Sequence, residues 1–246
     1  MVLVSGCGFL SKSLSGMDSQ QLASAAGNAM TALTITDAQI EQLSVQSVAY
    51  LDEENEIDKG DYQKRLQGLM AKLKPVEGLT LNVKVYKLNE VNAFACGDGS
   101  IRVYSGLMDV MDDAELIAII GHEIGHVVHK DTKTAMRKAY LASAARDVIS
   151  AAGGVIGTLS RSVVGDLAES YLSAQFSQKQ EYEADEYGYQ FAVANGYDKY
   201  SMYNALNELL NLSQGAQSSR VEKMFSSHPG TPERAAKVKE MADSAE

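Results

Sequence analysis

The amino-acid sequence predicts an α+β fold, a mostly helical domain with a small, largely antiparallel three-stranded sheet. Apolar residues recur at spacings of three and four over most of the chain and alternate with polar residues only within residues 79–105. The 246 residues are 45% hydrophobic, which is enough to bury the core of one large domain. We therefore expect a flexible N-terminal tether over residues 1–20 and a single domain over residues 21–246.

The first part of this domain, residues 21–75, is predicted to be helical. Residues 21–49 are rich in Ala and Gln and carry apolar residues at helical intervals, which predicts one or two helices. A further helix is predicted over residues 61–74, and Pro75 ends it because proline lacks the amide hydrogen that a helix uses. No motif in these helices points to chemistry.

The sheet is predicted where the period of the pattern changes to two. Apolar and polar residues alternate over 79–85, a short apolar run covers 91–95, and the alternation returns over 101–104. Between the last two runs lies Gly-Asp-Gly at 97–99, a composition typical of a hairpin connection. Three strands within residues 79–105 are the simplest interpretation.

Residues 112–130 are predicted to form a helix beside this sheet. Asp112 and Glu115 have the spacing of a capping box, which marks a helix start. Placed at helical intervals, the apolar residues share one broad face, and three residues that can bind a metal or transfer a proton share the opposite, narrower sector. These three residues are His122, Glu123 and His126.

The chain after Gly106 is otherwise predicted to be helical. One helix covers residues 181–195, and a last helix covers residues 232–242 after a turn that two prolines and a glycine enforce. Residues 148–159 are the most apolar run, and they are fewer than the ~18–20 residues that a membrane-spanning helix needs.

The histidine pair predicts a zinc site, with one ion per chain. His122 and His126 are four residues apart, so their imidazoles lie on adjacent turns and can bind one ion together. Glu123 points about 100° round the helix, where it can reach a metal-bound water without entering the coordination sphere. Because zinc lowers the pKa of that water and the carboxylate removes its proton, the three residues predict hydrolytic chemistry.

A third protein ligand must come from another part of the chain. Glu181 and Asp185 are four residues apart and share a helix face, while Glu183 projects to the other side. One of the pair can ligate zinc and the other can hold a ligand imidazole through its distal N–H. The alternative is a solvated acidic helix face. His129 lies about 10 Å from His122 along the helix axis and is interpreted as a last-turn residue.

Four segments of the chain resemble peptidase family M48, which includes bacterial membrane-stress proteases and the CAAX prenyl endopeptidases. They are Asn-Ala-Phe-Ala at 92–95, His-Glu-Ile-Gly-His at 122–126, Glu-Tyr-Glu-Ala-Asp at 181–185 and Ser-His-Pro at 227–229. Their order is that of the family, and together they span most of the chain from about residue 80 onward. The resemblance implies a zincin-type metallopeptidase domain of the soluble, periplasmic or lipid-anchored type.

The resemblance also implies roles for single residues of the zinc site. The ligands that it implies are His122, His126 and Glu181. Glu123 is implied as the general base, and Asp185 as the residue that orients a histidine ligand.

A substrate-binding strand is implied as well. An extended polypeptide substrate would pair with the strand backbone, a mode of binding with little side-chain selectivity. Asn92 would support this cleft, and the alternative for Asn92 is a turn residue beside a strand. The implied strand residues are Ile101, Arg102, Val103 and Tyr104.

His228 has two implied roles. It either stabilises the oxyanion of the reaction or occupies the position of the water in a closed state. Turn chemistry alone also explains the sequence His-Pro-Gly-Thr-Pro at 228–232, so a plain turn residue is the alternative. Arg234 is a weaker candidate for the oxyanion role.

These observations predict a zinc endopeptidase that clips unfolded or misassembled polypeptides in the bacterial periplasm. The alternative is a chaperone-like envelope-assembly factor whose zinc site is mostly held shut by His228. A purely structural zinc module would have four protein ligands and no exchangeable water. Glu123 favours the enzyme, because a structural zinc site has no need of a base.

Charge and cysteine usage bear on partners and location. The net charge of −10 and the lack of a Lys/Arg-rich run argue against nucleic acid as a partner. Two cysteines, Cys7 and Cys96, do not make a disulfide scaffold. Leu-Val-Ser-Gly-Cys at 3–7 resembles a lipobox, which predicts membrane attachment through a lipidated Cys7. The preceding apolar stretch is short for a secretory signal, so a flexible N-terminus is the alternative.

Overall fold

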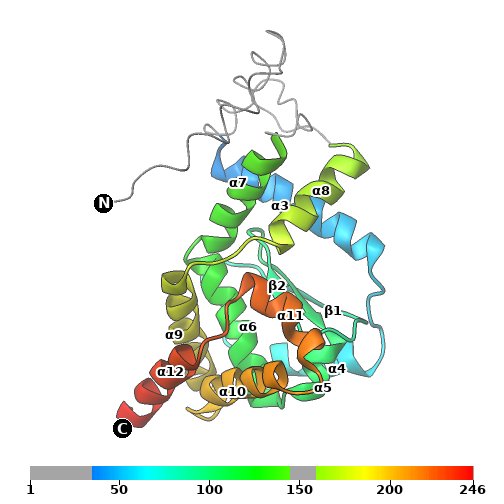
Figure 1. The fold of residues 1–246 in the computed structure, drawn as a ribbon. Helices are drawn as coiled ribbons and strands as arrows, with labels where there is room; N and C mark the ends of the chain where they lie inside the picture. The colour runs from blue at the N-terminus through cyan, green and yellow to red at the C-terminus, as the bar shows by residue number, and fades with distance from the viewer. Residues whose placement is uncertain (1–34, 145–158, 246) are drawn as a thin grey trace, which may run out of the picture.

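The computed structural model describes residues 35–144 and 159–245, drawn as a coloured ribbon in Figure 1. The predicted tether, Cys7 and most of residues 148–159 lie outside the described residues. Within them the helices and strands follow in the order α3 Asp37–Glu54, α4 Asp61–Met70, β1 Asn82–Tyr86, β2 Ala93–Ala95, β3 Ser100–Tyr104, α5 Ser105–Val110, α6 Asp113–Val128, α7 Asp131–Ala144, α8 Arg161–Leu172, α9 Gln178–Ala194, α10 Ser201–Gln214, α11 Ser218–Ser227 and α12 Pro232–Ser244.

The α+β class and the three strands are confirmed, but the sheet is mixed. Its strand order is β1-β3-β2, with β3 parallel to β1 and antiparallel to β2. The antiparallel half is the expected hairpin, in which Gly99 takes a φ of 85° that favours glycine. The parallel half corrects the expectation of a largely antiparallel sheet. The chain leaves β1, passes the position of the central strand and forms β2 at the other edge of the sheet. It then turns back through the hairpin into β3, which fills the centre and runs parallel to β1.

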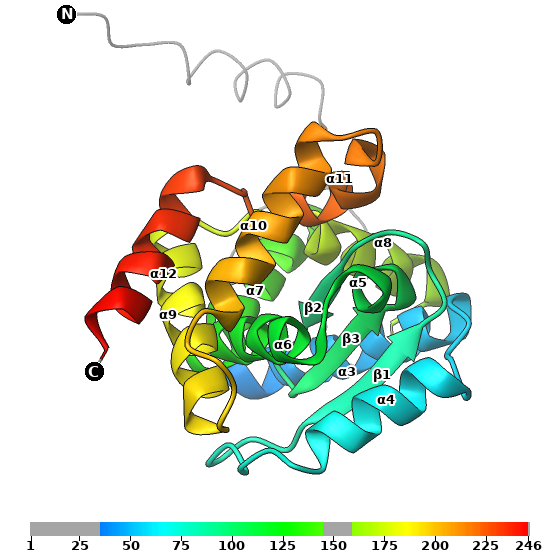
Figure 2. The ribbon, with the colours of Figure 1, turned by 90° about the horizontal axis from the view of Figure 1, so that it is seen from below.

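Helix α6 is the central element of the fold. Its N-cap Asp112 accepts hydrogen bonds from two backbone amides, and Glu115 accepts one from the Asp112 amide at 2.9 Å, so the capping box is confirmed. Figure 2 shows α6 between the sheet on one side and α9 and α10 on the other. The helix is therefore covered on its histidine-bearing sector as well as on its apolar face, and a polar group placed there is removed from solvent.

Two hydrophobic cores lie on the two faces of the sheet. Val85 and Val103 point into the core shared with α6 and α10, whereas Tyr86 and Tyr104 point into the core shared with α3, α7 and α8. This division follows from the alternation of side chains along a strand. Figure 1 shows α3, α7 and α8 together at the upper end and α9, α10 and α12 at the lower end, so the sheet and α6 join two helical layers.

Most predicted helices correspond to observed ones. Within the described residues, α4, α6 and α12 lie close to the expected ranges, with ends shifted by a few residues. Helix α3 covers the later part of the expected range 21–49 and runs on to Glu54, and residues 21–34 of that range lie outside the described residues. Helix α9 begins earlier than expected, because Ser177 caps it and Gln180 completes a capping box. In the same part of the chain, no helix has both the length and the apolar character that crossing a membrane requires.

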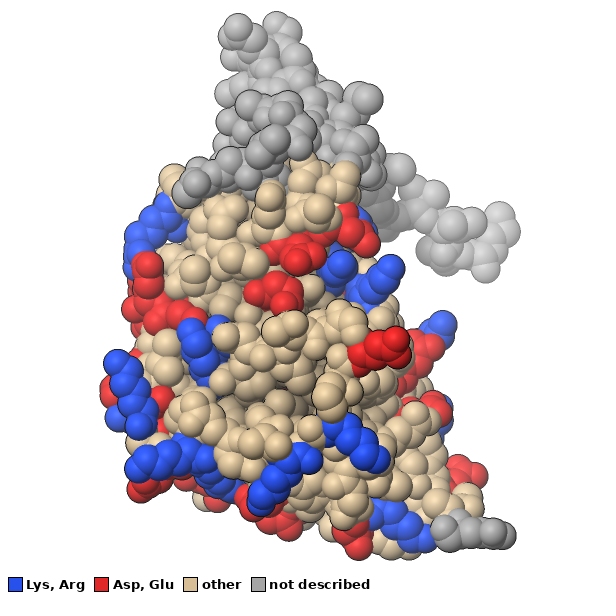
Figure 3. All heavy atoms as spheres, turned by 180° about the vertical axis from the view of Figure 1, so that it is seen from behind, with Lys and Arg blue, Asp and Glu red and all other residues tan. Residues whose placement is uncertain are grey.

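Charged side chains of both signs share the surface. On the face in Figure 3, Lys and Arg are interspersed with Asp and Glu over the described part of the chain. Some are paired directly, such as Arg161 with Glu53 and Glu54, and Lys239 with Asp243 at 2.6 Å. Exposed pairs of this kind contribute little to stability, because water and salt screen them.

Candidate metal centre

Close packing of α6 on α9 brings the predicted site residues together. A Cβ atom on Gly188 would lie 2.7 Å from the carbonyl oxygen of Ala118 and 3.0 Å from the amide nitrogen of His122. Only glycine leaves room for this approach of two helix backbones. Consequently the first two turns of α9, which carry Glu181 and Asp185, lie directly against the histidines of α6.

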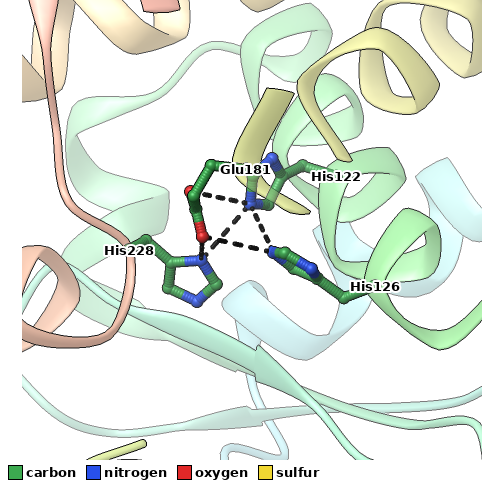
Figure 4. A group of neighbouring side chains, drawn as sticks. All are labelled: His122, His126, Glu181 and His228. Atoms are coloured by element: carbon green, nitrogen blue, oxygen red, sulfur yellow. Dashed lines mark hydrogen bonds and ion pairs between the residues drawn. The ribbon is translucent and has the colours of Figure 1, made fainter. Parts of the chain in front are cut away.

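Four buried side chains converge on one point. The potential ligand atoms of His122, His126, Glu181 and His228 all lie within 4.8 Å of one another. The two Nε2 atoms of His122 and His126 are 3.1 Å apart, and Nδ1 of His228 lies 3.3 Å from Nε2 of His122. Oε1 of Glu181 lies 3.0 Å from His228 Nδ1. Figure 4 shows the four side chains pointing toward one another from α6, α9 and the turn after α11.

The hydrogen bonds around this group fit a cation. His122 Nδ1 donates to Asp185 Oδ1 at 2.9 Å, and His126 Nδ1 donates to Asp131 Oδ2 at 3.0 Å. With both Nδ1 atoms donating, the two Nε2 atoms face each other, and a cation between them, a metal ion or a shared proton, stabilises this close approach. Tetrahedral zinc with bonds of ~2.0–2.1 Å places its ligand atoms about 3.3–3.4 Å apart. The shortest separations in this group, 3.0–3.5 Å, lie close to that value.

The charge states of His122, Asp185 and Glu181 suit a metal. Burial alone would lower the pKa of His126, but with no ion bound the hydrogen bonds to Asp131 and Glu181 outweigh it and raise that pKa to about 9. Burial lowers the pKa of His122, which keeps its imidazole neutral and its lone pair available. Burial alone would raise the pKa of Asp185, but the hydrogen bonds and charge of Arg234 outweigh it and hold that pKa below its ordinary value. Burial alone would likewise raise the pKa of Glu181, but the adjacent imidazoles of His228 and His126 outweigh it and lower that pKa.

Glu123 lies beside the group without belonging to it. Its side chain is 2% exposed, and Oε1 has no hydrogen-bond partner among the described residues. Nε2 of His228 lies 3.7 Å from Oε1. A buried carboxylate oxygen without a donor is costly, so its retention calls for a function.

The segment between α8 and α9 covers the group. The ring of Phe176 stacks on His126 with 4.0 Å between the ring centres and 13° between the planes, and the Phe176 amide donates to the Ser227 carbonyl. Near the end of α8, the Tyr171 hydroxyl donates to the carbonyl of Ala95 in β2. The space left between this cover, β2 and Glu123 is about 20 Å³. In this conformation the site is closed to a polypeptide.

The prediction that substrate pairs with the strand Ile101 to Tyr104 is wrong, because this strand has no free edge. Residues Ile101 to Tyr104 form the central strand β3, whose backbone already bonds to β1 and to β2, so no edge remains for a substrate. Arg102 is 1% exposed and its guanidinium binds Asp52 at 2.7 and 2.9 Å. Within the described residues the outer strand beside the metal centre is β2, and Asn92 immediately precedes it, next to Glu123 and His228.

Two contacting residues were missing from the sequence prediction. Asp131 holds His126 from five residues further on, where Lys130 with a φ of 63° turns the chain back after α6. Since five residues is not a helical spacing, periodicity gave no signal for it. Phe176 lies in a segment without a motif, and only its closeness to the histidine helix in three dimensions marks it.

Comparisons with known proteins agree with this geometry. A family model described as Peptidase family M48 matches residues 57–242. Metalloprotease LoiP of Escherichia coli (strain K12) is 40% identical over 227 residues, which cover 91% of this chain and 88% of the relative. Metalloprotease YcaL of the same organism is 36% identical over 241 residues, covering 97% of this chain and 92% of the relative.

More distant similarity extends to proteins with another name. A Protease HtpX homolog of Polynucleobacter necessarius subsp. necessarius (strain STIR1) is 26% identical over 201 residues, covering 66% of this chain and 68% of the relative. The family match covers far more than half of the chain and includes every member of the buried ligand group. The chain therefore belongs to peptidase family M48 and is a metalloprotease that uses zinc.

Proposed function

We propose that this metalloprotease is an endopeptidase that cleaves unfolded or misassembled polypeptides of the bacterial envelope, with Glu123 as its general base. The observation that carries the proposal is the buried carboxylate of Glu123, which lies beside the ligand group without a donor of its own. A structural zinc site needs no such group. A hydrolase needs it to take a proton from the attacking water.

The residues present define how zinc would be held. His122, His126 and Glu181 are the proposed ligands, with Asp185 and Asp131 fixing the two imidazole rings from behind. When bound, zinc supplies Lewis acidity, which acidifies a water molecule and polarises the carbonyl of the scissile bond. Glu123 then receives the proton of the attacking water on its free Oε1 and delivers it to the nitrogen of the leaving amine.

The backbone of β2 is the proposed binding place for substrate. It is the outer strand beside Glu123, and Ala93 and Ala95 have their neighbours in β3 on one side only. An extended polypeptide that pairs with this edge places a peptide bond near the metal with little demand on its side chains. That mode of binding suits clients that are recognised by being unfolded rather than by a sequence. Asn92 at the start of the strand lines the same space.

His228 is proposed to close the site by acting as a fourth ligand. Its Nδ1 lies within hydrogen-bond distance of Glu181 and 3.3 Å from His122 Nε2, the place that a water or substrate carbonyl would take. His228 follows α11 directly and precedes Pro229, so rotation of this turn would withdraw the ring without unfolding a helix. Of the two roles considered from the sequence, this geometry supports the inhibitory one.

Two variants test these roles against casein as substrate. Glu123→Gln is expected to keep one zinc per chain and to lose about 10²–10⁴-fold in turnover, the usual contribution of a general base. His228→Ala is expected to retain zinc and to raise proteolysis several-fold, because the fourth position is then free. His129→Ala is the matched control, since His129 ends α6 outside the ligand group. Full turnover in the glutamine variant would remove Glu123 from the mechanism, and loss of turnover in His228→Ala would make that histidine catalytic.

The closed site also favours a second candidate function, a chaperone-like envelope-assembly factor. The ligand residues and Glu123 are all at most 5% exposed, so a substrate cannot reach them in the conformation described. The two functions differ in what Glu123→Gln does to a misfolded envelope protein. An assembly factor would still suppress aggregation of the client with this variant, whereas a pure protease would not.

Attachment to the periplasmic face of a membrane through Cys7 is proposed from the sequence alone. The support is the lipobox-like run that ends at Cys7. Metabolic labelling of the full-length precursor with palmitate, compared with Cys7→Ser, tests it. Labelling confined to the wild type is expected, and equal labelling of both would exclude the anchor.

A further inference from the structure

Arg234 is a buried cation that contacts the metal centre from behind. It lies in the first turn of α12 and is 3% exposed. Nε and Nη2 donate to Asp185 at 2.7 and 2.6 Å, and Nη1 lies 2.5 Å from Oε2 of Glu181 and 3.0 Å from the Pro229 carbonyl. All three nitrogens of the guanidinium therefore face acceptors that belong to the site or to the turn carrying His228.

These contacts give the two oxygens of Glu181 different partners. Oε2 is held by Arg234, while Oε1 faces His126 Nε2 at 3.5 Å and His228 Nδ1 at 3.0 Å. Oε2 is only 3.8 Å from Nε2 of His122, close enough to reach a shared ion if nothing restrained it. A carboxylate whose two oxygens both bind a zinc ion fills a position that a catalytic site must keep for water or substrate.

We propose that Arg234 is a positioning residue that restricts Glu181 to a single metal bond through Oε1. The planar fork of arginine makes this possible, since Nε and Nη2 donate to Asp185 while Nη1 donates to the Pro229 carbonyl and forms an ion pair with Oε2 of Glu181. The lysine ammonium is a compact charge and cannot bridge both carboxylates in this way. This inference rests on the proposed ligation of zinc by Glu181.

A cobalt-substituted protein reports the number of ligand atoms. Visible absorption of Co²⁺ weakens several-fold when four-coordinate metal becomes five-coordinate, and the ion replaces zinc in the same ligands. Arg234→Lys is expected to bind one Co²⁺ and to show this loss, because Oε2 of Glu181 is released to the metal. Arg65→Lys is the matched control, since Arg65 bonds to the Met108 and Met111 carbonyls away from the centre. An unchanged cobalt spectrum in Arg234→Lys would overturn the proposal.

A measurement on the wild-type zinc protein covers the case in which Arg234→Lys does not fold. X-ray absorption at the zinc edge is expected to show one carboxylate oxygen bound to the metal, and two oxygens from Glu181 would overturn the proposal. Glu181→Gln separates the two levels of inference. If this variant keeps the zinc affinity and the spectrum of the wild type, ligation by Glu181 itself is refuted. If it loses them while Arg234→Lys changes nothing, only the role of Arg234 fails.

Discussion

Replacing Asp52 by asparagine tests whether Arg102 belongs to the scaffold or to the substrate cleft. Asp52 in α3 binds the Arg102 guanidinium with both oxygens, and it also accepts from Lys84 at 2.6 Å and from the Tyr86 hydroxyl at 2.7 Å. The side chain of Arg102 is 1% exposed and that of Asp52 is 16% exposed. Asp52→Asn therefore leaves a guanidinium buried in the central strand without its counter-charge.

The size of the effect follows from this burial. Breaking a buried ion pair by removing one partner costs about 3–5 kcal/mol in the free energy of unfolding. This is a large share of the ~5–15 kcal/mol that stabilises a typical native protein. Arg102→Met should cost less, ~1–3 kcal/mol, because Asp52 keeps Lys84 as a partner and is partly open to water.

Urea unfolding of the zinc-loaded protein measures both variants, and casein kinetics measure whether substrate binding changes. We expect lower unfolding midpoints with an unchanged slope, and a KM for the folded fraction of Arg102→Met equal to that of the wild type. If Arg102→Met keeps the stability of the wild type and raises KM, Arg102 contacts substrate and the scaffold interpretation is refuted.

The same ion pair predicts a pH dependence. Burial alone would raise the pKa of Asp52, but the bonds from Arg102, Lys84 and Tyr86 outweigh it and hold the pKa below its ordinary value of 3.8. A group whose pKa is lower in the folded than in the unfolded state stabilises the fold above the unfolded pKa and loses this effect as the pH falls through the folded pKa. The stability of the wild type should therefore fall below pH ~4 more steeply than that of Asp52→Asn.

Three further results are expected. Removing zinc with a chelator should lower the melting temperature, and adding zinc should restore it, because the metal binds only the folded chain. At a zinc concentration of 100 times Kd the gain in the free energy of unfolding is about 2.7 kcal/mol, and an unchanged calorimetric transition would contradict the site. In a Cys7→Ser variant, Cys96 should resist thiol reagents until urea unfolds the protein, since burial raises its thiol pKa; immediate labelling would show it accessible. Gly188→Ala should destabilise by about 1–3 kcal/mol, whereas Gly68→Ala, which has open space around it in α4, should stabilise by about 0.5–1 kcal/mol; equal shifts in unfolding midpoint would refute the close helix contact.

The sequence predicted the elements of the fold better than their arrangement. Periodicity and capping residues marked α6 and α12 because a helix is stabilised by contacts within a few residues of each other. The strand order was not predictable in the same way. Whether β1 pairs with β3 in parallel depends on how the chain crosses over between distant segments, and alternation of apolar residues is identical for both directions.

The same contrast holds for the candidate site. His122 and His126 were placed together from helix geometry alone, and the structure also brings Glu181, Asp185 and His228 to them. Their assigned roles remain predictions until the variants are measured. Asp131 and the fork of Arg234 were beyond the reach of spacing arguments, because they approach through a turn and from the last helix.

The covered edge of β2 has a consequence for the behaviour of the protein in concentrated solution. A sheet edge with free amides and carbonyls is a template for any extended chain, including a second copy of the same molecule. The Tyr171 hydroxyl on the Ala95 carbonyl removes part of that template while the site is shut. Opening of the cleft to a client therefore also exposes the β2 edge to self-association of the protease. Variants held permanently open should precipitate sooner than the wild type, and the three-residue length of β2 limits how strongly they do so.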